Sequence, residues 1–330
     1  MKAWLLDSLS GIDSLRLADI PDPVAGAGQV VLDILYAGLN PADKYLSIGQ
    51  YPAKPAFPHI LGRDGIGVIS SIGPGVTGFS PGQKCLVLRG PVGVSAPGTF
   101  AEKTAVPIDS LAAPPSGWSD QESAGAALVY LTAYQALTMW PDLPSSGTVL
   151  VTGASGGVGV AAVHLAKAMG HKVIALSRDP AKQTRLREIG ADITLDPADP
   201  RWRKAAIEQN AGRRVDLAID NIGGSNLSVV IDALAEHGRV SCVGRLAGPV
   251  PQFNTASLFF RRLKMGGVAV GTYTAQEAQS AWAKVVELLT AHKAKPLIDS
   301  VFPFGEVKTA FARLAAGPMG KVLLAVGGTH

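Results

Sequence analysis

The chain has 330 residues, of which 47% are hydrophobic and 17% are charged, and this composition excludes an intrinsically disordered protein. The length exceeds what one hydrophobic core usually serves, so we expect two domains. The formal net charge is +4 and the basic residues are scattered along the chain, which argues against a nucleic-acid partner.

The cysteine content and the N-terminal segment bear on the cellular compartment. The two cysteines, Cys85 and Cys242, lie far apart in apolar runs, so we expect no disulfide framework. The first 23 residues lack the pattern of a signal peptide, and no apolar run reaches the length of a membrane span. These features predict a cytoplasmic protein without a membrane-spanning segment.

Residues 1 to about 115 carry short apolar runs that are typical of β-strands, at 29–39, 65–73 and 83–90. Glycine and proline separate these runs, and the stretch 73–83 alone holds four glycines and two prolines. Many short strands with such turns predict a β-rich domain of the barrel or sandwich type.

After residue 144 the pattern changes to alternating strands and helices. Strands are predicted at 148–152, 172–177, 192–196, 214–220 and 239–244, and helices at 156–170, 180–190, 200–212 and 226–238, each of the last two closed by a glycine. This alternation predicts βαβ units and a parallel sheet. The tail is β-like again at 296–304 and 320–326, and it could return to the first domain.

The stretch "VTGASGGVGV" at residues 151–160 joins the first of these strands to the first helix. Its four glycines predict a sharp turn that leaves backbone N–H groups and the helix dipole open to a pyrophosphate. Gly157 and Gly159 stand where a tight turn and a close packing contact are needed. A tight turn without a ligand is the alternative, and the surrounding βαβ pattern favours dinucleotide binding.

The end of the second parallel strand indicates which dinucleotide is bound. Ser177, Arg178 and Lys182 offer a hydroxyl and two cations, which suit the 2′-phosphate of NADP. Asp179 complicates this reading, because an acid at this point binds the ribose hydroxyls of NAD, although it could instead cap the helix that begins at Pro180. Arg178 and Lys182 could also be ordinary surface charges, and we favour NADPH.

These features, in this order, resemble the zinc-free medium-chain dehydrogenase/reductases, specifically the NADPH:quinone oxidoreductases and their enone-reducing relatives. The resemblance covers nearly the whole chain and rests on "GLNPADKYLSIGQY" (38–51), "LGRDGIGVISSIGPGVTGFSPGQKCLV" (61–87), "GTFAEKTAVP" (98–107), "LTAYQAL" (131–137), the glycine loop with its helix (151–170), "AIDNIGG" (218–224), "GRVSCVG" (238–244) and "GKVLLAV" (320–326). It implies an α/β protein with a GroES-like β-rich catalytic domain at 1–125, completed by 295–330, and a Rossmann domain with a parallel sheet at 126–294. It also suggests a homodimer formed at a sheet edge near 264–273.

The resemblance also implies where the cofactor would be held. Asn40 and Thr132 would line its nicotinamide end, and Asn221 and Gly244 would edge the cofactor site. The pyrophosphate would meet Gly156, Gly157 and Val158, and the 2′-phosphate would meet Ser177, Arg178 and Lys182.

Zinc alcohol dehydrogenases share this fold, so the metal ligands decide the chemistry. Asn40 stands where those enzymes have a thiolate, and Gly62-Arg63-Asp64 replaces their Gly-His-Glu run. The region 85–110 holds Cys85 as its one cysteine, and none of the six histidines has a paired metal-binding spacing. We therefore expect no zinc, and His59 is the one histidine near the expected site.

Without a Lewis acid, the sequence favours transfer of hydride from NADPH to a quinone or to the β-carbon of an enone, because these acceptors delocalise the charge themselves. Tyr51 is a candidate hydrogen-bond donor to the developing oxyanion, or else an apolar anchor of its loop. Arg63 could stabilise the same charge or pair with Asp64, while Asp43 and Tyr45 are expected to support the turn at Asn40.

Two other functions stay open. One is a zinc-free dehydrogenase or reductase that acts on alcohols or enoyl thioesters. The other is a protein that binds NADPH as a structural or sensing ligand with little turnover.

Overall fold

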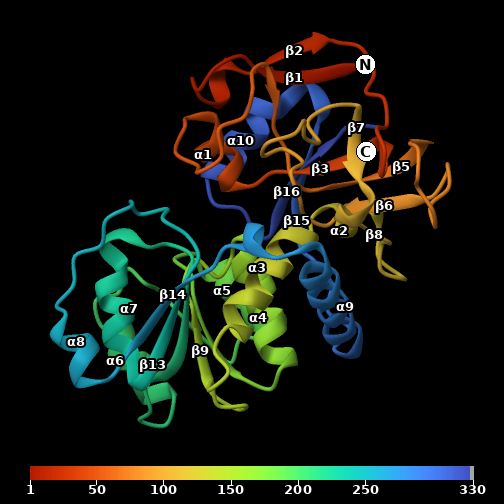
Figure 1. Ribbon diagram of the computed structural model, residues 1–330. Helices are drawn as coiled ribbons and strands as arrows, with labels where there is room; N and C mark the ends of the chain where they lie inside the picture. The colour runs from red at the N-terminus through yellow and green to blue at the C-terminus, as the bar shows by residue number, and fades with distance from the viewer. Residues whose placement is uncertain (328–330) are drawn as a thin grey trace. The chain divides into compact units, whose positions relative to one another are not determined.

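The computed structural model describes residues 1–327, and the chain forms two compact units (Figure 1). The first unit contains Met1–Leu128, Gly271–Trp282 and the segment from Lys295 onward; the second contains Val129–Val270 and Ala283–Ala294. Residues 271–282 thus belong to the first unit, whereas the division drawn from the sequence places them in the second domain. No helix within the described residues is long and apolar enough to cross a membrane.

The first unit is rich in β-structure and contains two sheets. One has the strand order β2-β1-β4, and the other has the order β15-β16-β3-β5-β6-β8, with β7 also paired to β3. The strands are β1 (Lys2–Leu6), β2 (Arg16–Asp19), β3 (Gln29–Gly38), β4 (His59–Ile60), β5 (Gly65–Ile72), β6 (Lys84–Val87), β7 (Lys103–Pro107), β8 (Leu111–Ala112), β15 (Ile298–Pro303) and β16 (Lys321–Ala325).

The C-terminal tail completes the sheet of the first unit. Strand β16 pairs antiparallel with β3, with Leu323 opposite Gly38. All five residues of β16 are buried, which explains why its sequence is an almost continuous apolar run. The two ends of the chain therefore build one sheet, as the β-like tail suggested.

Within residues 1–327, three α-helices lie wholly in the first unit: α1 (Pro41–Ser47), α2 (Asp120–Ala124) and α10 (Val307–Ala315). Helix α10 turns Val307, Ala310 and Phe311 inward, and this spacing of three and four residues places them on one helical face. The ring of Phe311 meets that of Phe100 edge to face, with centroids 5.9 Å apart. This contact ties the C-terminal helix to the core of the N-terminal strands.

The second unit contains a six-stranded parallel sheet with the order β11-β10-β9-β12-β13-β14. In chain order this is third, second, first, fourth, fifth, sixth, which is the strand order of a Rossmann domain. The strands are β9 (Thr148–Val151), β10 (Lys172–Leu176), β11 (Ile193–Leu195), β12 (Val215–Asp220), β13 (Leu234–Cys242) and β14 (Lys264–Gly267). The α/β prediction is therefore confirmed.

Helices cover both faces of this sheet, with α6 and α7 on one side and α3 and α4 on the other (Figure 1). The strand order reverses at β9, and parallel α/β sheets bind ligands at the carboxyl ends of the strands where such a reversal occurs. The helices are α4 (Gly157–Ala168), α5 (Pro180–Glu188), α6 (Trp202–Gln209), α7 (Leu227–Ala233) and α8 (Ala256–Phe260), while α3 (Ala127–Thr138) and α9 (Ala275–Ala291) extend over unit boundaries. Short 3-10 helices lie at Ile12–Ser14, Ile108–Ser110, Gly224–Asn226, Val270–Thr272 and Phe304–Glu306.

One predicted helix is shorter than the sequence suggested. The prediction of a helix over 226–238 is wrong after Ala233, because α7 ends there and β13 begins at Leu234. Leu234 is fully buried opposite Val215, and the pairing then shifts before Arg239 meets Leu217. Burial of Leu234 in the sheet overrides the helical pattern, and Gly238 is not a helix cap.

Strand β14 forms one edge of the sheet, and it lies in the segment at which the family resemblance suggests a dimer contact. An edge strand has backbone groups that can pair with another chain. The structure describes one chain, so the homodimer stays a prediction.

Helices α3 and α4 are joined by a buried polar contact. The hydroxyl group of Tyr130 lies 2.8 Å from Nδ1 of His164, and the two rings are stacked. His164 is almost fully buried, and burial lowers the pKa of its imidazole to about 4. The ring is therefore neutral in the folded protein at pH values where the unfolded chain binds a proton.

We predict that acidification destabilises the protein through this histidine. Between pH 6.5 and pH 4 the unfolded state binds a proton at His164 and the folded state does not, so the free energy of unfolding falls by about 3 kcal/mol. Urea unfolding at several pH values measures this slope. The variant His164→Gln should show a shallower decline than the parent, and an unchanged slope would contradict the prediction.

Candidate cofactor-binding and active sites

The glycine turn after β9 combines two glycines that the fold itself requires. Gly153 has a φ of +56°, and a Cβ there would lie 2.9 Å from Cδ1 of Ile222. A Cβ on Gly159 would lie 2.3 Å from the carbonyl oxygen of Gly153, so the helix can approach the turn only with glycine at this point. The packing role predicted for Gly159 is confirmed. The tight-turn role predicted for Gly157 is wrong, because Gly157 is the first residue of α4 and Gly153 makes the turn.

Gly156 is different, because the protein gives no reason for a glycine there. Its φ of −72° suits any residue, and a Cβ would meet only the carbonyl oxygen of Gly153 at 3.5 Å, an ordinary contact. It is the N-cap of α4, where Ser, Thr, Asp or Asn would usually cap the helix. The N–H groups of Gly157 and Val158 follow in the first turn, which has no helical acceptors for them. This combination fits an anion held close to the backbone.

A buried hydrogen-bond network joins the ends of β9 and β12 beside this turn. Thr152 donates from Oγ1 to Oδ1 of Asp220 at 2.7 Å, and accepts from the backbone N–H of Asn221 at 2.9 Å. The side-chain amide of Asn221 donates from Nδ2 to the carbonyl oxygen of Thr152 at 2.8 Å. Its Oδ1 is buried and has no hydrogen-bond partner within residues 1–327. Asn221 thus holds an oriented acceptor that suits a hydroxyl or amide donor of a ligand.

Gly244 lies beyond β13, close to the backbone of Asn221. A Cβ on Gly244 would lie 2.1 Å from the carbonyl oxygen of Asn221, so glycine here is explained by packing between the strand ends. Thr132 lies half-buried on α3. A cofactor contact for Gly244 or Thr132 stays a prediction.

The end of β10 brings the second group of predicted residues next to the glycine turn. The backbone N–H of Ala154, within the turn, donates to the carbonyl oxygen of Leu176 at 3.2 Å. Ser177 follows and is nearly buried, while Arg178 is exposed. Asp179 caps α5 by accepting from the backbone N–H groups of Ala181 and Lys182 at 2.9 and 3.3 Å. Its carboxylate therefore has a structural role in the helix.

The first unit contains a separate buried cluster around Asn40. The Nζ group of Lys321 donates to Oδ1 of Asn40 at 2.8 Å, to Oδ2 of Asp64 at 2.9 Å and to the carbonyl oxygen of Leu39 at 3.0 Å. An ammonium group has three N–H donors, so all three are used. Because Oδ1 of Asn40 accepts from Lys321, the opposite side of its amide is a donor, and Nδ2 lies 3.3 Å from the carbonyl oxygen of Gly38.

A second ion pair supports the same turn. Nε of Arg63 donates to Oδ1 of Asp43 at 3.0 Å, and Oδ2 of Asp43 accepts from the backbone N–H of Asn40 at 3.0 Å. The alternative that Arg63 pairs with Asp64 is wrong, because Asp64 pairs with Lys321. Burial raises the pKa of the Asp43 carboxyl, and the charge of Arg63 opposes this shift.

Tyr51 lies against this ion pair, with Cζ of Arg63 4.7 Å from the centroid of its ring. This contact is a cation–π interaction that orients the ring. Nη2 of Arg63 is buried without a hydrogen-bond partner in the part of the chain that the structure describes. His59, on β4, is also buried, and burial lowers the pKa of its imidazole.

These side chains do not fit a zinc ion. The ammonium group of Lys321 already contacts Oδ1 of Asn40 and Oδ2 of Asp64, and Arg63 adds a second positive charge. Zinc in proteins is bound by thiolate, imidazole and carboxylate groups. Among residues 1–327 no group of three or more His, Cys, Asp or Glu side chains could hold a metal ion. We therefore derive no step through a metal.

Comparison with known proteins agrees with this architecture. Residues 26–116 match the family of alcohol dehydrogenase GroES-like domains, and residues 157–291 match the family of zinc-binding dehydrogenases. A quinone oxidoreductase of Lama guanicoe is 29% identical over 336 residues, which cover 98% of this chain and 97% of the relative. The chain belongs to the medium-chain dehydrogenase/reductase family. It is an oxidoreductase of that family.

Two solved structures of this family are similar over almost the whole chain. An NAD-dependent alcohol dehydrogenase has a TM-score of 0.90 and 29% identity, with 99% of this chain and 100% of that chain covered. A mycobacterial protein complexed with NADPH has a TM-score of 0.88 and 26% identity, with 98% and 100% covered. One neighbour is NAD-dependent and the other is complexed with NADPH, so the choice of cofactor has to be argued from this chain's own residues.

Three supporting residues were missed from the sequence: Thr152, Asp220 and Lys321. Thr152 and Asp220 each end a buried apolar strand, and polar residues at the carboxyl ends of neighbouring parallel strands are a usable signal. Lys321 opens a strand that is otherwise apolar, and a charged residue in a buried run requires a partner. Its partner is 257 positions away, which no local pattern indicates.

We predict that Lys321→Met destabilises the protein strongly. Removal of the ammonium group leaves the Asp64 carboxylate buried without a cation, which costs about 3–5 kcal/mol in comparable buried pairs. Urea unfolding measures the loss. The double variant Lys321→Met with Asp64→Asn removes both charges and should recover part of it; equal stability of the single variant and the parent would contradict the buried ion pair.

Proposed function

We propose that this protein is an NADPH-dependent reductase that delivers hydride to a quinone or an α,β-unsaturated carbonyl compound without a metal ion. The observation that carries the proposal is the N-terminus of α4. There Gly156 is a glycine that the fold does not require, beside N–H groups that have no helical acceptor. The quinone oxidoreductase among the relatives supports the substrate class.

The second unit carries the groups proposed to hold the cofactor. The pyrophosphate would meet the N–H groups of Gly157 and Val158, with Gly156 leaving room for it. Asn221, with its open Oδ1, would accept from a hydroxyl or amide group of the cofactor. Gly244, close to the backbone of Asn221, and Thr132 are proposed as further cofactor contacts.

The 2′-phosphate of NADPH is proposed to meet Ser177, Arg178 and Lys182. Asp179 caps α5 through Oδ1, and this structural role accounts for an acid at this position without a ribose contact. The solved neighbour with NADPH supports the assignment, and the NAD-dependent neighbour is the reason to test it. Arg178 is exposed at the end of β10, where a phosphate dianion can reach it.

The first unit carries the groups proposed to act at the nicotinamide and the substrate. When bound, the reduced cofactor supplies a hydride. Lys321 fixes the amide of Asn40, so that Asn40 is proposed to orient the nicotinamide end by hydrogen bonding. Tyr51, oriented by Arg63, is proposed to donate a hydrogen bond to the substrate oxygen on which negative charge develops.

The proposed substrates follow from the charges of this cluster, because its cations are not free to act on an alcohol hydroxyl. Oxidation of an ordinary alcohol needs a group that lowers the pKa of its hydroxyl, and the fixed cations Lys321 and Arg63 are already paired with carboxylates. A quinone or an enone spreads the incoming charge over its own conjugated system. The proton that completes the reduction can then come from Tyr51 or from solvent.

We predict that Arg178→Ala weakens NADPH binding by tenfold or more and leaves NADH binding nearly unchanged, because the arginine meets a phosphate that NADH lacks. Fluorescence titration with each reduced nucleotide measures both dissociation constants. Equal losses for the two nucleotides would contradict the phosphate assignment.

The matched comparison is Gly156→Ala, which should weaken NADPH and NADH alike because both carry the pyrophosphate. Gly305→Ala is the control, since a Cβ there meets nothing within 4 Å and its φ is not in the positive region. If Gly156→Ala and Gly305→Ala both bind the two nucleotides as tightly as the parent does, the N-terminus of α4 is not the pyrophosphate site.

We predict that NADPH is consumed with phenanthrenequinone and with an alkyl vinyl ketone, and that propanol with NADP gives no reaction. Tyr51→Phe should lower kcat about a hundredfold to a thousandfold with little change in nucleotide affinity, the range seen when an oxyanion donor is removed. Alcohol oxidation would favour the dehydrogenase alternative. Tight NADPH binding without turnover on any acceptor would favour a sensing or structural role.

A further inference from the structure

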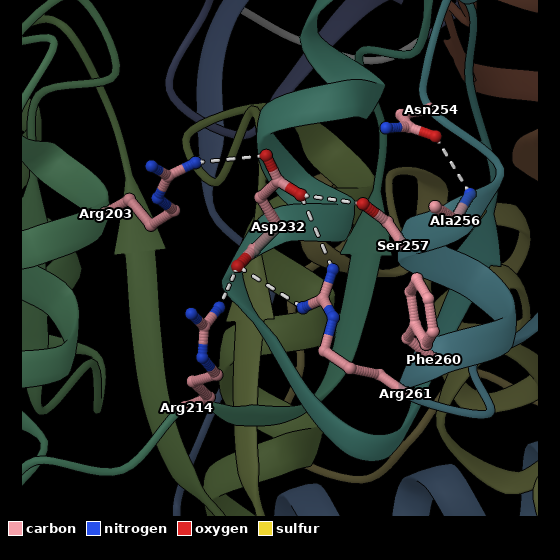
Figure 2. A pocket seen from close by; sticks show the side chains of 8 residues that line it. All are labelled: Arg203, Arg214, Asp232, Asn254, Ala256, Ser257, Phe260 and Arg261. Carbon is pink, nitrogen blue, oxygen red and sulfur yellow. Dashed lines mark hydrogen bonds and ion pairs between the residues drawn. The ribbon is translucent and has the colours of Figure 1, made fainter.

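The second unit has a basic pocket at the edge of its sheet opposite the glycine turn. The pocket has a volume of about 460 Å³, and Figure 2 shows three arginines converging on Asp232. Arg214 immediately precedes the first residue of β12, whereas the glycine turn follows the last residue of β9. Because β9 and β12 are parallel, the pocket and the turn lie at opposite ends of the strands. The pocket is therefore separate from the proposed cofactor site.

The arginines outnumber the acid that holds them. Nη1 of Arg203 lies 3.2 Å from Oδ2 of Asp232, and Nη2 of Arg261 lies 3.4 Å from Oδ1. Arg214 donates from Nη1 to the backbone carbonyl of Asp232. Three guanidinium groups beside one carboxylate leave two positive charges uncompensated at this point. Burial and the neighbouring Arg214 accordingly lower the pKa of Arg261.

The same contacts hold the arginines in place for a ligand. Nη1 of Arg261 also donates to the carbonyl oxygen of Leu234 at 2.7 Å, so its guanidinium is fixed at two points. Each guanidinium has five N–H donors, more than these contacts use. Ser257 donates to Oδ1 of Asp232 at 3.2 Å and faces the same cavity. An arginine cluster fixed in this way suits a phosphate group, which takes several N–H donors at once.

A second cavity adjoins the first and extends the positive surface. It has a volume of about 510 Å³, shares Arg203 and Arg214 with the first, and adds Arg201 and Lys204. Glu208 lines it and lies 3.7 Å from Lys204, and Asp199 accepts from Arg201 at 3.5 Å. The lining residues of the two cavities together carry five cationic and two anionic side chains. A ligand with more than one phosphate group can use both cavities.

An aromatic ring stands at the edge of the first cavity. Phe260 lines it with 77% of its surface exposed, and its ring lies 4.5 Å from that of Phe259. Large exposed aromatic side chains are unusual unless something covers them. A planar base can stack on such a ring, as bases do on aromatic side chains in nucleic-acid-binding proteins.

We propose that this pair of cavities binds a nucleoside polyphosphate, with its phosphate groups on Arg203, Arg214 and Arg261 and its base on Phe260. The site lies outside the residues that the proposed function uses. A nucleotide bound there would act as an effector or as a second ligand and not as the hydride donor. The chemistry that recognises it is the pairing of phosphate with guanidinium and the stacking of a base on Phe260.

Calorimetric titration of ATP into protein saturated with NADPH tests the proposal, because the cofactor site is then filled. We expect ATP to bind without displacing NADPH, and Arg203→Gln and Arg214→Gln each to weaken it tenfold or more. Arg16→Gln is the matched control, since it removes an exposed arginine that pairs with Asp7 in the first unit. Absence of ATP binding, displacement of NADPH by ATP, or equal weakening in Arg16→Gln would overturn the site.

Tripolyphosphate has phosphate groups but no nucleoside, so it tests the arginines separately from Phe260. We expect it to bind the same arginines more weakly than ATP, and Phe260→Ala to bring the two affinities together. Equal affinities in the parent would overturn the nucleoside assignment. Should the protein not bind NADPH at all, titration of ATP into the parent and the Arg203→Gln variant still decides this proposal, so its failure and that of the proposed function are distinguishable.

Discussion

The hydrogen bond between Oγ1 of Thr152 and Oδ1 of Asp220 joins the ends of two adjacent parallel strands, and the cofactor edge of the second unit depends on it. Asp220 also accepts from the backbone N–H groups of Ile222 and Gly223 at 3.2 and 3.1 Å, which turns the chain away from β12. Thr152 in turn holds the backbone and the side chain of Asn221. A threonine and an aspartate that make no proposed contact with a ligand thus fix both the turn and the acceptor beside it. Satisfied buried networks of this kind are rigid, which favours a preformed binding site.

The first unit buries charged side chains by pairing each carboxylate with a cation. Two carboxylates and two cations lie within one buried cluster, with Arg63 on Asp43 and Lys321 on Asp64. Burying four charges is expensive, and apolar side chains of similar size would often be at least as stable. What the ions add here is geometry. Lys321 holds the side-chain oxygen of Asn40, while Asp43, itself paired with Arg63, holds the backbone N–H of the same residue, so that Asn40 is fixed from two sides.

Local patterns predicted much of the fold and less of the cluster. The alternation of buried strands and glycine-closed helices gave the parallel sheet, and Gly159 could be assigned because a helix packed on a strand needs a close approach. Helix α7 was predicted too long, because the sequence does not show that Leu234 pairs with Val215 in the sheet. The partners of Arg63 and Lys321 depend on pairings across the fold, at separations of 20 and 257 residues. Adjacency in the sequence suggested Asp64 for Arg63, yet Arg63 pairs with Asp43 and Asp64 pairs with Lys321.

The two ends of the parallel strands differ in how positive charge is presented there. At the carboxyl edge the positive end of α4 and glycines without side chains create it, so a ligand must come close to the backbone, and the fit is set by the absence of Cβ atoms. At the amino ends of the strands the charge is carried by long arginine side chains that Asp232 holds in place. These side chains line an open cavity. The first arrangement suits an anion held close to the helix, and the proposed pyrophosphate would account for a glycine at position 156, where the protein's own packing does not require one. The second arrangement presents unused N–H donors of several guanidinium groups over an open cavity, so it would suit phosphate groups at more than one position.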